Sequence, residues 1–499
     1  MSIARPFLPF KIEVTAKRLD TTAHGGLPVV LEAARLVWPK SWYRRLQDAL
    51  GYESWKVVRR HVESVLLLVA AGGESVDDLK VLAADAGLKQ LLGFKLSSPT
   101  RVKEFLYRFD QDGKGVRLSR EESASKSQQG SAVIRGEGPG LHQLGEMVKE
   151  GVRRVQGVRT SEMVTMDTDA TLVESSKETA LYSYEGSRAY QPMMAWWAEQ
   201  AVWVGDQFRD GNVGSNTGLL EFVTQVAATL PPSARHRRFR ADSAFYNEDM
   251  LTWLDENGWK FGVSAMMSGE LTQAIQTIPD GGWTPCRPPA PALGQSTPTG
   301  NASPADGGAD SREIRECAEV PDFIPNWKRT SKKDTRPFRY VAIRVRSRQP
   351  DLFVPGKELW RHFAVVTNRH DLTAADLIRW HRAKQGTVEH GHGDLKNELA
   401  GGKLPSARFG ANAAWWRLNV MCHNLLAFLK SAALPQRMLP MRPKALRFHL
   451  FNLPGIVLHH ARQTILRISA THPGASVLEA ARSALQATWA ASLSVSPTG

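Results

Sequence analysis

One stretch of the 499-residue chain decides its fold class, and it reads MVTMDTDATLV over residues 163–173. Its apolar and β-branched residues are typical of a strand. Because side chains alternate along a strand, Asp167 and Asp169 share one face. Carboxylates inside an apolar segment are costly unless a cation compensates their charge. This stretch therefore predicts a strand whose acidic side chains meet a positively charged partner.

Further strand and helix signals follow this stretch in a definite order. Strand-like runs lie at 193–197 and 201–208, followed by a helix at 217–230, a strand at 238–242, a helix at 247–257 and a strand at 260–264. Three strands followed by helix, strand, helix and strand are the order of a ribonuclease-H-like α/β core. We therefore expect an α/β fold built on such a core.

The core pattern is then interrupted. Residues Pro285 to Gly308 are dominated by Pro, Ala, Gly, Ser and Thr, and this composition predicts a disordered loop. The strand-like run Tyr340 to Arg346 indicates that the inserted segment is mostly β. The core resumes with a strand at 362–367 and with helices at 373–384 and 387–399.

Positive charge is concentrated near the C-terminus. The chain has 64 Lys and Arg against 50 Asp and Glu, a net charge of +14. Between Leu399 and Leu478 there is no Asp or Glu, and the basic residues of that segment are Lys403, Arg408, Arg417, Lys430, Arg437, Arg442, Lys444, Arg447, Arg462 and Arg467. Charges of one sign repel one another unless a polyanion lies alongside, although a solvated basic face is the alternative. We therefore expect double-stranded DNA as the partner, with Arg442, Lys444 and Arg447 on its phosphates.

The N-terminal part predicts a run of short helices. A turn at 97–100 precedes the basic helix Arg101 to Phe109, an arrangement that suits a recognition helix in the DNA major groove. We expect five regions: 1–140 as a helical DNA-end-binding region, 141–267 as the first part of the ribonuclease-H-like core, 268–360 as a β insertion with the disordered loop, 361–430 as the second part of the core, and 431–499 as a basic helical C-terminal region.

The cysteines and the apolar runs limit the class of protein. Cys286, Cys317 and Cys422 are scattered, so they predict neither a zinc site nor a disulfide framework. The sequence has no apolar run of membrane-spanning length, and its start does not resemble a secretory signal. We expect no membrane association and a cytoplasmic, nucleoid-associated protein of bacterial type.

Carboxylates occur at three places where an α/β sheet would expose them. Asp169 lies in the first strand, Asp242 ends the strand at 238–242, and Glu389 lies in the helix at 387–399. Two Mg²⁺ ions about 3.5–4 Å apart would compensate such a group of charges. Carboxylate oxygens are the hard ligands that Mg²⁺ prefers, and the ion also accepts phosphate oxygens.

These residues and their surroundings resemble the DDE insertion-sequence transposases that carry a Y-R-E-K signature around the final glutamate. The segments that carry the resemblance are DTDAT (167–171), FRDGN (208–212), RADSAF (240–245), GTVE (386–389), NEL (397–399) and RFGANAAWW (408–416). The resemblance implies a cut-and-paste transposase with a ribonuclease-H-like core. Such an enzyme cleaves transposon ends and joins them to target DNA by two-metal phosphoryl transfer.

The resemblance also assigns roles to residues. It makes Asp169, Asp242 and Glu389 the catalytic, metal-binding triad, with two Mg²⁺ ions for which Mn²⁺ substitutes. It implies that Lys396 contacts a phosphate near the transposon end, and it includes Arg209 of the FRDGN segment among the DNA-binding residues. Glu389 and Lys396 are seven residues apart, so they would lie on one helix face two turns from each other. Synapsis of terminal inverted repeats and target DNA implies a homodimer on DNA.

The signature is not complete. Gln385 stands where an arginine is expected four residues before Glu389, and Arg382 stands where a tyrosine is expected. Glutamine cannot form the bidentate phosphate contact of an arginine. We therefore expect Arg382 or Lys384 to take that contact, and weakened activity is the alternative.

Two further choices concern single positions. Asp167 and Asp169 are both candidates for the first carboxylate, and we prefer Asp169 because the family pattern places it two positions before a threonine, here Thr171. His390 and His392 invite a metal hypothesis, but alternate helix positions point in different directions. We therefore expect both histidines at the surface or near DNA.

Two other functions are compatible with this sequence. A ribonuclease-H-like nuclease without strand transfer would share the triad, although it has no need of the insertion or of the long basic segment. A catalytically decayed protein that only binds transposon ends is the second alternative, and Gln385 is the feature that favours it.

Overall fold

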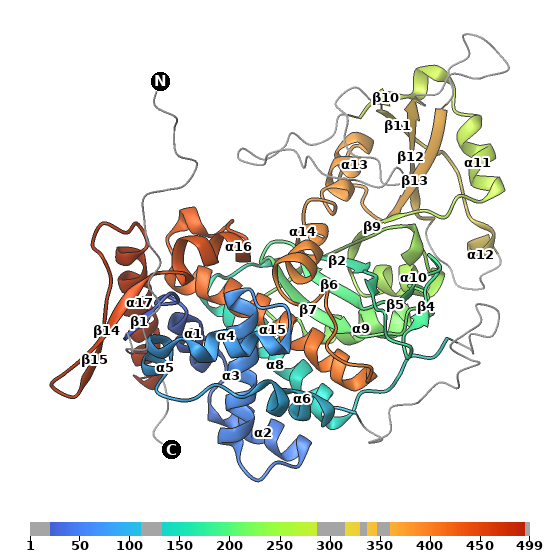
Figure 1. Cartoon of the computed structure of the whole chain (residues 1–499). Helices are drawn as coiled ribbons and strands as arrows, with labels where there is room; N and C mark the ends of the chain where they lie inside the picture. The colour runs from blue at the N-terminus through green and yellow to red at the C-terminus, as the bar shows by residue number, and fades with distance from the viewer. Residues whose placement is uncertain (1–19, 111–131, 287–314, 330–336, 347–359, 495–499) are drawn as a thin grey trace, which may run out of the picture.

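The computed structural model describes residues 20–110, 132–286, 315–329, 337–346 and 360–494 (Figure 1). Its centre is a nine-stranded mixed sheet in the order β10-β11-β12-β13-β9-β8-β2-β6-β7. Helices flank the sheet and form both ends of the chain. The fold class is therefore mixed α/β, which confirms the prediction.

Five strands form the part of the sheet that the sequence predicts as the core. They are β2 (Met163–Ala170), β6 (Met193–Trp197), β7 (Val202–Gln207), β8 (His236–Ala241) and β9 (Lys260–Ser264). β2, β6 and β7 are antiparallel neighbours, whereas β8 runs parallel to β2 and β9 runs parallel to β8. The order β7-β6-β2-β8-β9 with these directions is that of a ribonuclease-H-like sheet, as the succession of strands and helices predicts.

The inserted segment extends this sheet instead of folding away from it. Its elements are α11 (Gly269–Gln276), η4 (Asp280–Gly282), β10 (Thr284–Pro285), β11 (Arg315–Glu319), α12 (Asn326–Arg329) and β12 (Arg339–Arg346). The next strand, β13 (Trp360–Thr367), pairs antiparallel with both β12 and β9. Of the predicted disordered loop, all but its first two residues lie outside the described residues.

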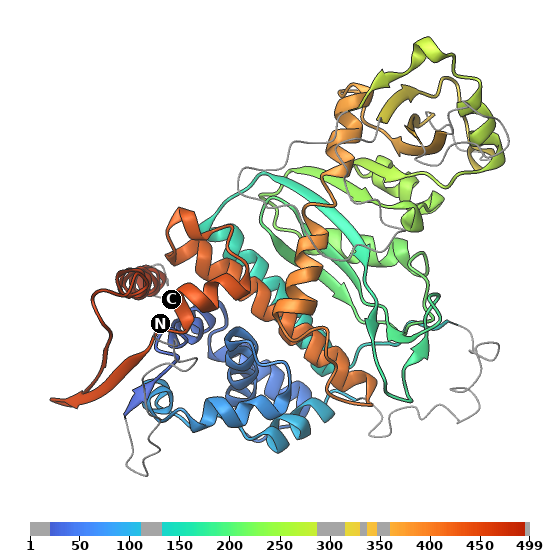
Figure 2. The same cartoon turned by 45° about the horizontal axis from the view of Figure 1, so that its top comes forward.

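Shorter elements connect and cover the core. They are β3 (Val173–Glu174), β4 (Leu181–Tyr182), β5 (Arg188–Tyr190), α9 (Leu219–Thr229), η3 (Ser243–Phe245), α10 (Glu248–Glu256), α13 (Ala374–Arg382), α14 (Val388–Gly393) and a π turn, η5 (Asp394–Glu398). Figures 1 and 2 show α13 beside the insertion strands and α14 near the end of β2. The chain therefore returns from the insertion to the middle of the core through these two helices.

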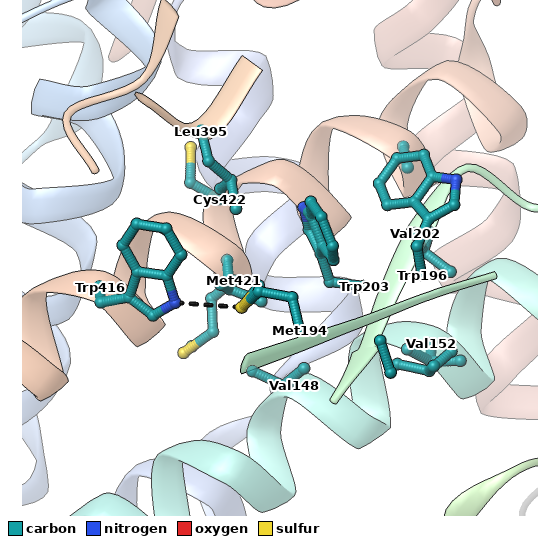
Figure 3. Packing of buried hydrophobic residues seen from close by; sticks show 14 of the residues in the cluster. Val148, Val152, Met194, Trp196, Val202, Trp203, Leu395, Trp416, Met421 and Cys422 are labelled. Atoms are coloured by element: carbon teal, nitrogen blue, oxygen red, sulfur yellow. Dashed lines mark hydrogen bonds between the residues drawn. The ribbon is translucent and has the colours of Figure 1, made fainter. Parts of the chain in front are cut away.

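The longest helix, α15 (Phe409–Ala433), is the centre of the hydrophobic core, and it is buried along nearly its whole length. It packs on α8 (Pro139–Val158) and on β7. Figure 3 shows this packing, in which Trp416 donates its indole N–H to the sulfur of Met194 at 3.3 Å. Across the described ranges, no helix combines the length and the apolar character that a membrane crossing requires.

The N-terminal helices pack on the other side of α15. They are α1 (Pro28–Val37), α2 (Lys40–Leu50), α3 (Trp55–Ala71), η1 (Val76–Asp78), α4 (Leu79–Ala84), α5 (Ala86–Leu92) and α6 (Pro99–Tyr107). α1, α3 and α6 all contact α15. Figures 1 and 2 show these helices at one end of the molecule and the insertion at the other.

The C-terminal segment contains helices, as predicted, and also a β-hairpin that was not predicted from the sequence. Its elements are η6 (Gln436–Met438), α16 (Pro443–Leu446), a second π turn η7 (Arg447–Phe451), β14 (Gly455–His460), β15 (Gln463–Arg467) and α17 (Ala475–Ser494). β14 also pairs with β1 (Thr21–Thr22). Ala461 and Arg462 both have positive φ, as a two-residue type I′ turn requires. These residues rarely adopt that conformation, so the sequence carries no turn signal.

Candidate active site

The candidate site lies where β2 and β8 end side by side. These parallel strands pair Asp167 with Arg240, so two residues further on Asp169 is level with Asp242. Asp169 is the next-to-last residue of β2, and Asp242 directly follows β8. The structure therefore brings together two of the three carboxylates that the sequence predicts.

The pKa values of these two carboxylates are shifted by their surroundings. Burial raises the pKa of Asp169 and the pKa of Asp242. The charge of Asp167 adds to the upward shift at Asp169, and the charge of Asp169 adds to the upward shift at Asp242. The ammonium of Lys384 opposes this shift, and its Nζ lies 3.6 Å from Oδ2 of Asp169. Backbone N–H groups of Ala170 and Ala244 donate to the two carboxylates at 3.0 and 3.1 Å. The negative charge of the pair is thus met by a single close lysine and two amides.

Asp167 has a different environment on the same strand. Arg240 donates to both of its carboxylate oxygens, at 2.6 and 2.8 Å, and the Thr387 hydroxyl donates to one of them at 2.5 Å. Asp167 is fully buried. Because both oxygens are engaged by donors, Asp167 ties β2 to β8 and to the start of α14. This geometry favours Asp169 as the carboxylate that is available to a metal.

Glu389 lies in the first turn of α14 and is exposed. Within the described ranges, no three His, Cys, Asp or Glu side chains are arranged as a ready metal site. The structure thus does not assemble the predicted triad around one point. It does place α14 against the sheet, since a Cβ atom at Gly391 would come within 2.8 Å of the Trp196 and Trp203 rings. Glycine at this position allows the close approach.

The side chain of α14 that faces the aspartates is His392. Its Nε2 lies 3.8 Å from Oδ2 of Asp169, and its ring lies 4.9 Å from the ring of Trp203. Burial lowers the pKa of His392 to about 3, so the imidazole is neutral near pH 7. His390 is exposed, so the two histidines do point apart. Of the two expected locations, the surface is wrong for His392, because the helix signal does not tell which side packs on the Trp rings, and proximity to DNA stays a prediction.

Lys396 lies at the end of β2 as well. Its ammonium donates to the carbonyl of Leu172 at 2.8 Å and to the hydroxyl of Thr171 at 3.3 Å, and burial lowers its pKa. The predicted helix is present here but changes form, because α14 ends at Gly393 and the chain passes directly into the π turn η5. π turns are rare, and they often occur at functional sites.

The predicted DNA contacts differ in accessibility. Arg382 is half-buried and Gln385 is exposed, whereas Lys384 is buried beside Asp169. Arg209 is buried, and it donates to the Gln207 side chain and to the Thr217 carbonyl. A DNA phosphate cannot reach Arg209 in this structure, so that prediction is corrected. A shared motif identifies the residue but does not reveal its burial.

The basic residues near the C-terminus also have partners within the protein. Arg442 pairs with Asp394 at 2.6 Å and with Glu398 at 2.9 Å. Arg447 donates to the carbonyl groups of Ala70 and Glu398, and Lys444 is exposed. Lys403, Arg408 and Arg417 pair with carboxylates from before residue 399. The fold thus supplies acidic partners to part of this basic segment, and the prediction that DNA lies along it stays a prediction.

The donor set of the two aspartates fits a divalent metal. Both groups offer oxygen ligands, both are half-buried, and Lys384 is the close cation that the described residues place against them. An added cation would relieve the desolvation that raises both pKa values.

Comparisons with known proteins give one family. The model of the family described as transposase DDE domain, group 1, matches residues 44–490. No curated protein matches the chain. The chain is similar to a solved piggyBac transposase synaptic complex with hairpin DNA, at 10% identity over 85% of this chain and 79% of that one, with a TM-score of 0.44.

Proposed function

This chain belongs to the DDE transposase domain family, group 1, and we propose that it cleaves transposon ends and joins them to target DNA. In this proposal Asp169, Asp242 and Glu389 are the catalytic, metal-binding triad of the Y-R-E-K type. One observation carries the assignment: Asp169 and Asp242 lie level at the ends of two parallel strands of a ribonuclease-H-like sheet, half-buried and near Lys384.

Two Mg²⁺ ions, for which Mn²⁺ substitutes, would supply the positive charge that activates water and then the 3′-hydroxyl for phosphoryl transfer. The carboxylates of Asp169 and Asp242 would hold this charge from the sheet, and Glu389 would add its carboxylate from α14. Glu389 is one helical turn from His392, which is already 3.8 Å from Asp169. Residues three apart lie on one helix face, so Glu389 would join the pair from the same helix that carries His392.

Residues around the triad would position the DNA backbone. Lys396 lies at the end of β2, where its ammonium now donates to the protein backbone. We propose that a phosphate of the transposon end takes over this ammonium, because a charged acceptor makes a stronger hydrogen bond than a carbonyl. Arg382, half-buried at the end of α13, would contribute the contact that Gln385 cannot make.

The N-terminal helices would bind the terminal inverted repeat. A cavity of about 730 Å³ lies beside α6, and its lining includes the cationic residues Arg60, Lys95, Arg101 and Arg108 and the aromatic residues Tyr52 and Tyr107. Cations bind phosphates, and aromatic rings support bases or sugars. We propose that this end-binding region, the split core, the insertion and the basic C-terminal region act together in a homodimer on double-stranded DNA.

The test is incubation of the full chain with the ends of its own element and Mg²⁺, with nicks, hairpins and joined products resolved on a gel. We expect cleavage followed by joining to target DNA. Cleavage without joined products would indicate a nuclease of the same fold. Specific end binding without cleavage would indicate a catalytically decayed end-binding protein, and either outcome would overturn the proposal.

A further inference from the structure

We propose that His392 is a nitrogen ligand of the divalent metal that Asp169 and Asp242 hold. This inference rests on the proposed function, because it requires a metal at the two aspartates. It adds a donor of a different chemical class to a site that otherwise consists of carboxylates. The site would then be a mixed oxygen and nitrogen site, with His392 and Glu389 contributed by one helix.

The first reason is that His392 is a buried polar group without a partner. It is 8% exposed, and among the described residues neither of its ring nitrogens has a hydrogen-bond partner. Leaving a buried polar group unsatisfied costs about 1–3 kcal/mol. Such a group calls for an explanation, and a bound ion is one of the ordinary explanations.

The second reason is the direction of the ring. Nε2 is the atom of His392 that approaches Oδ2 of Asp169, at 3.8 Å. This separation is too long for a hydrogen bond. A nitrogen and an oxygen that face each other across such a gap are placed to share a third atom between them, and a metal ion takes both kinds of ligand.

The third reason is that packing fixes the imidazole in this position. The ring lies against Trp203 at 4.9 Å, and the helix that carries it is held close by Gly391. Ligand positions that are fixed before binding cost less to order when the ion arrives. Lys384, whose Nζ lies 3.6 Å from the same Oδ2 atom, would have to move away.

A nitrogen ligand has a consequence for metal preference. Imidazole suits later transition metals such as Co²⁺ and Zn²⁺ better than it suits Mg²⁺, which favours oxygen ligands. We therefore expect Mn²⁺ and Co²⁺ to bind this site more tightly than Mg²⁺ does. Replacing His392 by glutamine should reduce the difference in affinity between Mg²⁺ and the ions Mn²⁺ and Co²⁺, since the amide offers an oxygen in place of the nitrogen.

Pulsed electron paramagnetic resonance of the full chain loaded with Mn²⁺ tests the proposal. We expect a nitrogen coupling to the metal in the parent protein, and we expect the coupling to change when the histidines carry ¹⁵N. The coupling should disappear in His392→Gln and persist in the matched variant His390→Gln, whose side chain is exposed. The ¹⁵N measurement uses the parent protein, so it tests for a histidine ligand even if the His392→Gln variant folds poorly.

The outcomes separate this inference from the proposed function. If Mn²⁺ binds to the parent protein but not to the double variant Asp169→Asn, Asp242→Asn, the ion binds at the proposed site. Binding there without nitrogen coupling would overturn the role of His392 and leave the proposed function intact. Absence of Mn²⁺ binding at the aspartates would overturn both.

Discussion

The acidic ends of β2 and β8 and the basic segment 399–478 differ in how far their charges are balanced within the protein. In the basic segment, the buried Arg417 has two carboxylate partners, Glu137 and Asp206. At the strand ends, two half-buried carboxylates share Lys384 as their close lysine among the described residues. Balanced charge in a protein interior stabilises structure, whereas unbalanced charge invites a ligand. Arg417 of the basic segment is therefore balanced within the protein, whereas the carboxylates at the strand ends are not.

The largest effect should come from removing charge at the strand ends. Asp169→Asn, Asp242→Asn and Glu389→Gln each keep the size of the side chain and remove a negative charge that would offset the metal. We expect each to reduce nicking and strand transfer by about three orders of magnitude or more, because the same metals serve both steps. Gel assays of cleavage and joining would measure the loss, and band-shift assays should show that DNA-end binding survives.

Asp167→Asn is the matched variant on the same strand. It weakens the contact to Arg240 and so should lower thermal stability, but it removes no group that faces the proposed metal. Cleavage should fall less than in Asp169→Asn. If Asp167→Asn folds fully but does not cleave DNA, while Asp169→Asn does cleave it, the first carboxylate of the catalytic triad is Asp167.

Substituting the balanced Arg417 of the basic segment should change the stability of the protein rather than its activity. Arg417→Met would leave Asp206 and Glu137 without their buried cation, and breaking such a pair costs about 3–5 kcal/mol. Chemical denaturation of the purified variant would measure this loss. The exposed Arg437→Met serves as the control and should change stability by about 0.5 kcal/mol at most. Equal effects of the two variants would show that burial does not matter here.

A smaller effect is expected from replacing Lys384, and this effect should be tighter binding of the metal. This lysine neutralises Asp169 when no metal is present, so Lys384→Met removes a competitor of the metal. We expect metal to bind roughly tenfold more tightly, since about 1.4 kcal/mol of repulsion is removed. Calorimetric titration with Mn²⁺ would measure the change, and the exposed Arg379→Met should leave affinity unaltered. Weaker binding in Lys384→Met would show that the lysine supports the metal site.

The smallest effect concerns the DNA contacts of the basic segment. Arg442 and Arg447 are engaged within the protein, and Lys444 is exposed. Replacing all three by neutral residues should reduce the slope of log affinity against log salt by about 0.9, the value for one phosphate contact. Filter binding on random duplexes over a range of salt concentrations would measure it. A reduction of about 2.7 would mean that the arginines exchange their internal partners for phosphates.

The fold could be predicted from the sequence where the signals are local and periodic. The strands at 163–170, 193–197 and 260–264 follow from their apolar and β-branched residues, and their order indicates the ribonuclease-H-like sheet. The hairpin β14–β15 was missed because Ala461 and Arg462 form its turn without a glycine or asparagine. The π turn after Gly393 was missed because helix periodicity assumes one constant residue spacing.

The candidate site could be predicted only in part. Asp169 and Asp242 follow from strand ends, because parallel strands bring equivalent positions together. Three environments depend on contacts between distant segments, and no local pattern encodes them: the burial of Arg209, the partners of Arg417 and the position of His392 beside Asp169. The spacing of Glu389 and His392 on one helix is the signal that could have identified His392.

The most direct test of the central claim, that Asp169 and Asp242 hold a catalytic metal, is anomalous diffraction from crystals of the protein grown with Mn²⁺ and transposon-end DNA. We expect an anomalous peak at roughly 2 Å from carboxylate oxygens of both aspartates. Glu389 should close on the same ion, and the Lys384 ammonium should lie farther from Asp169 than the present 3.6 Å. Crystals with bound DNA, saturating Mn²⁺ and no peak between Asp169 and Asp242 would contradict the claim.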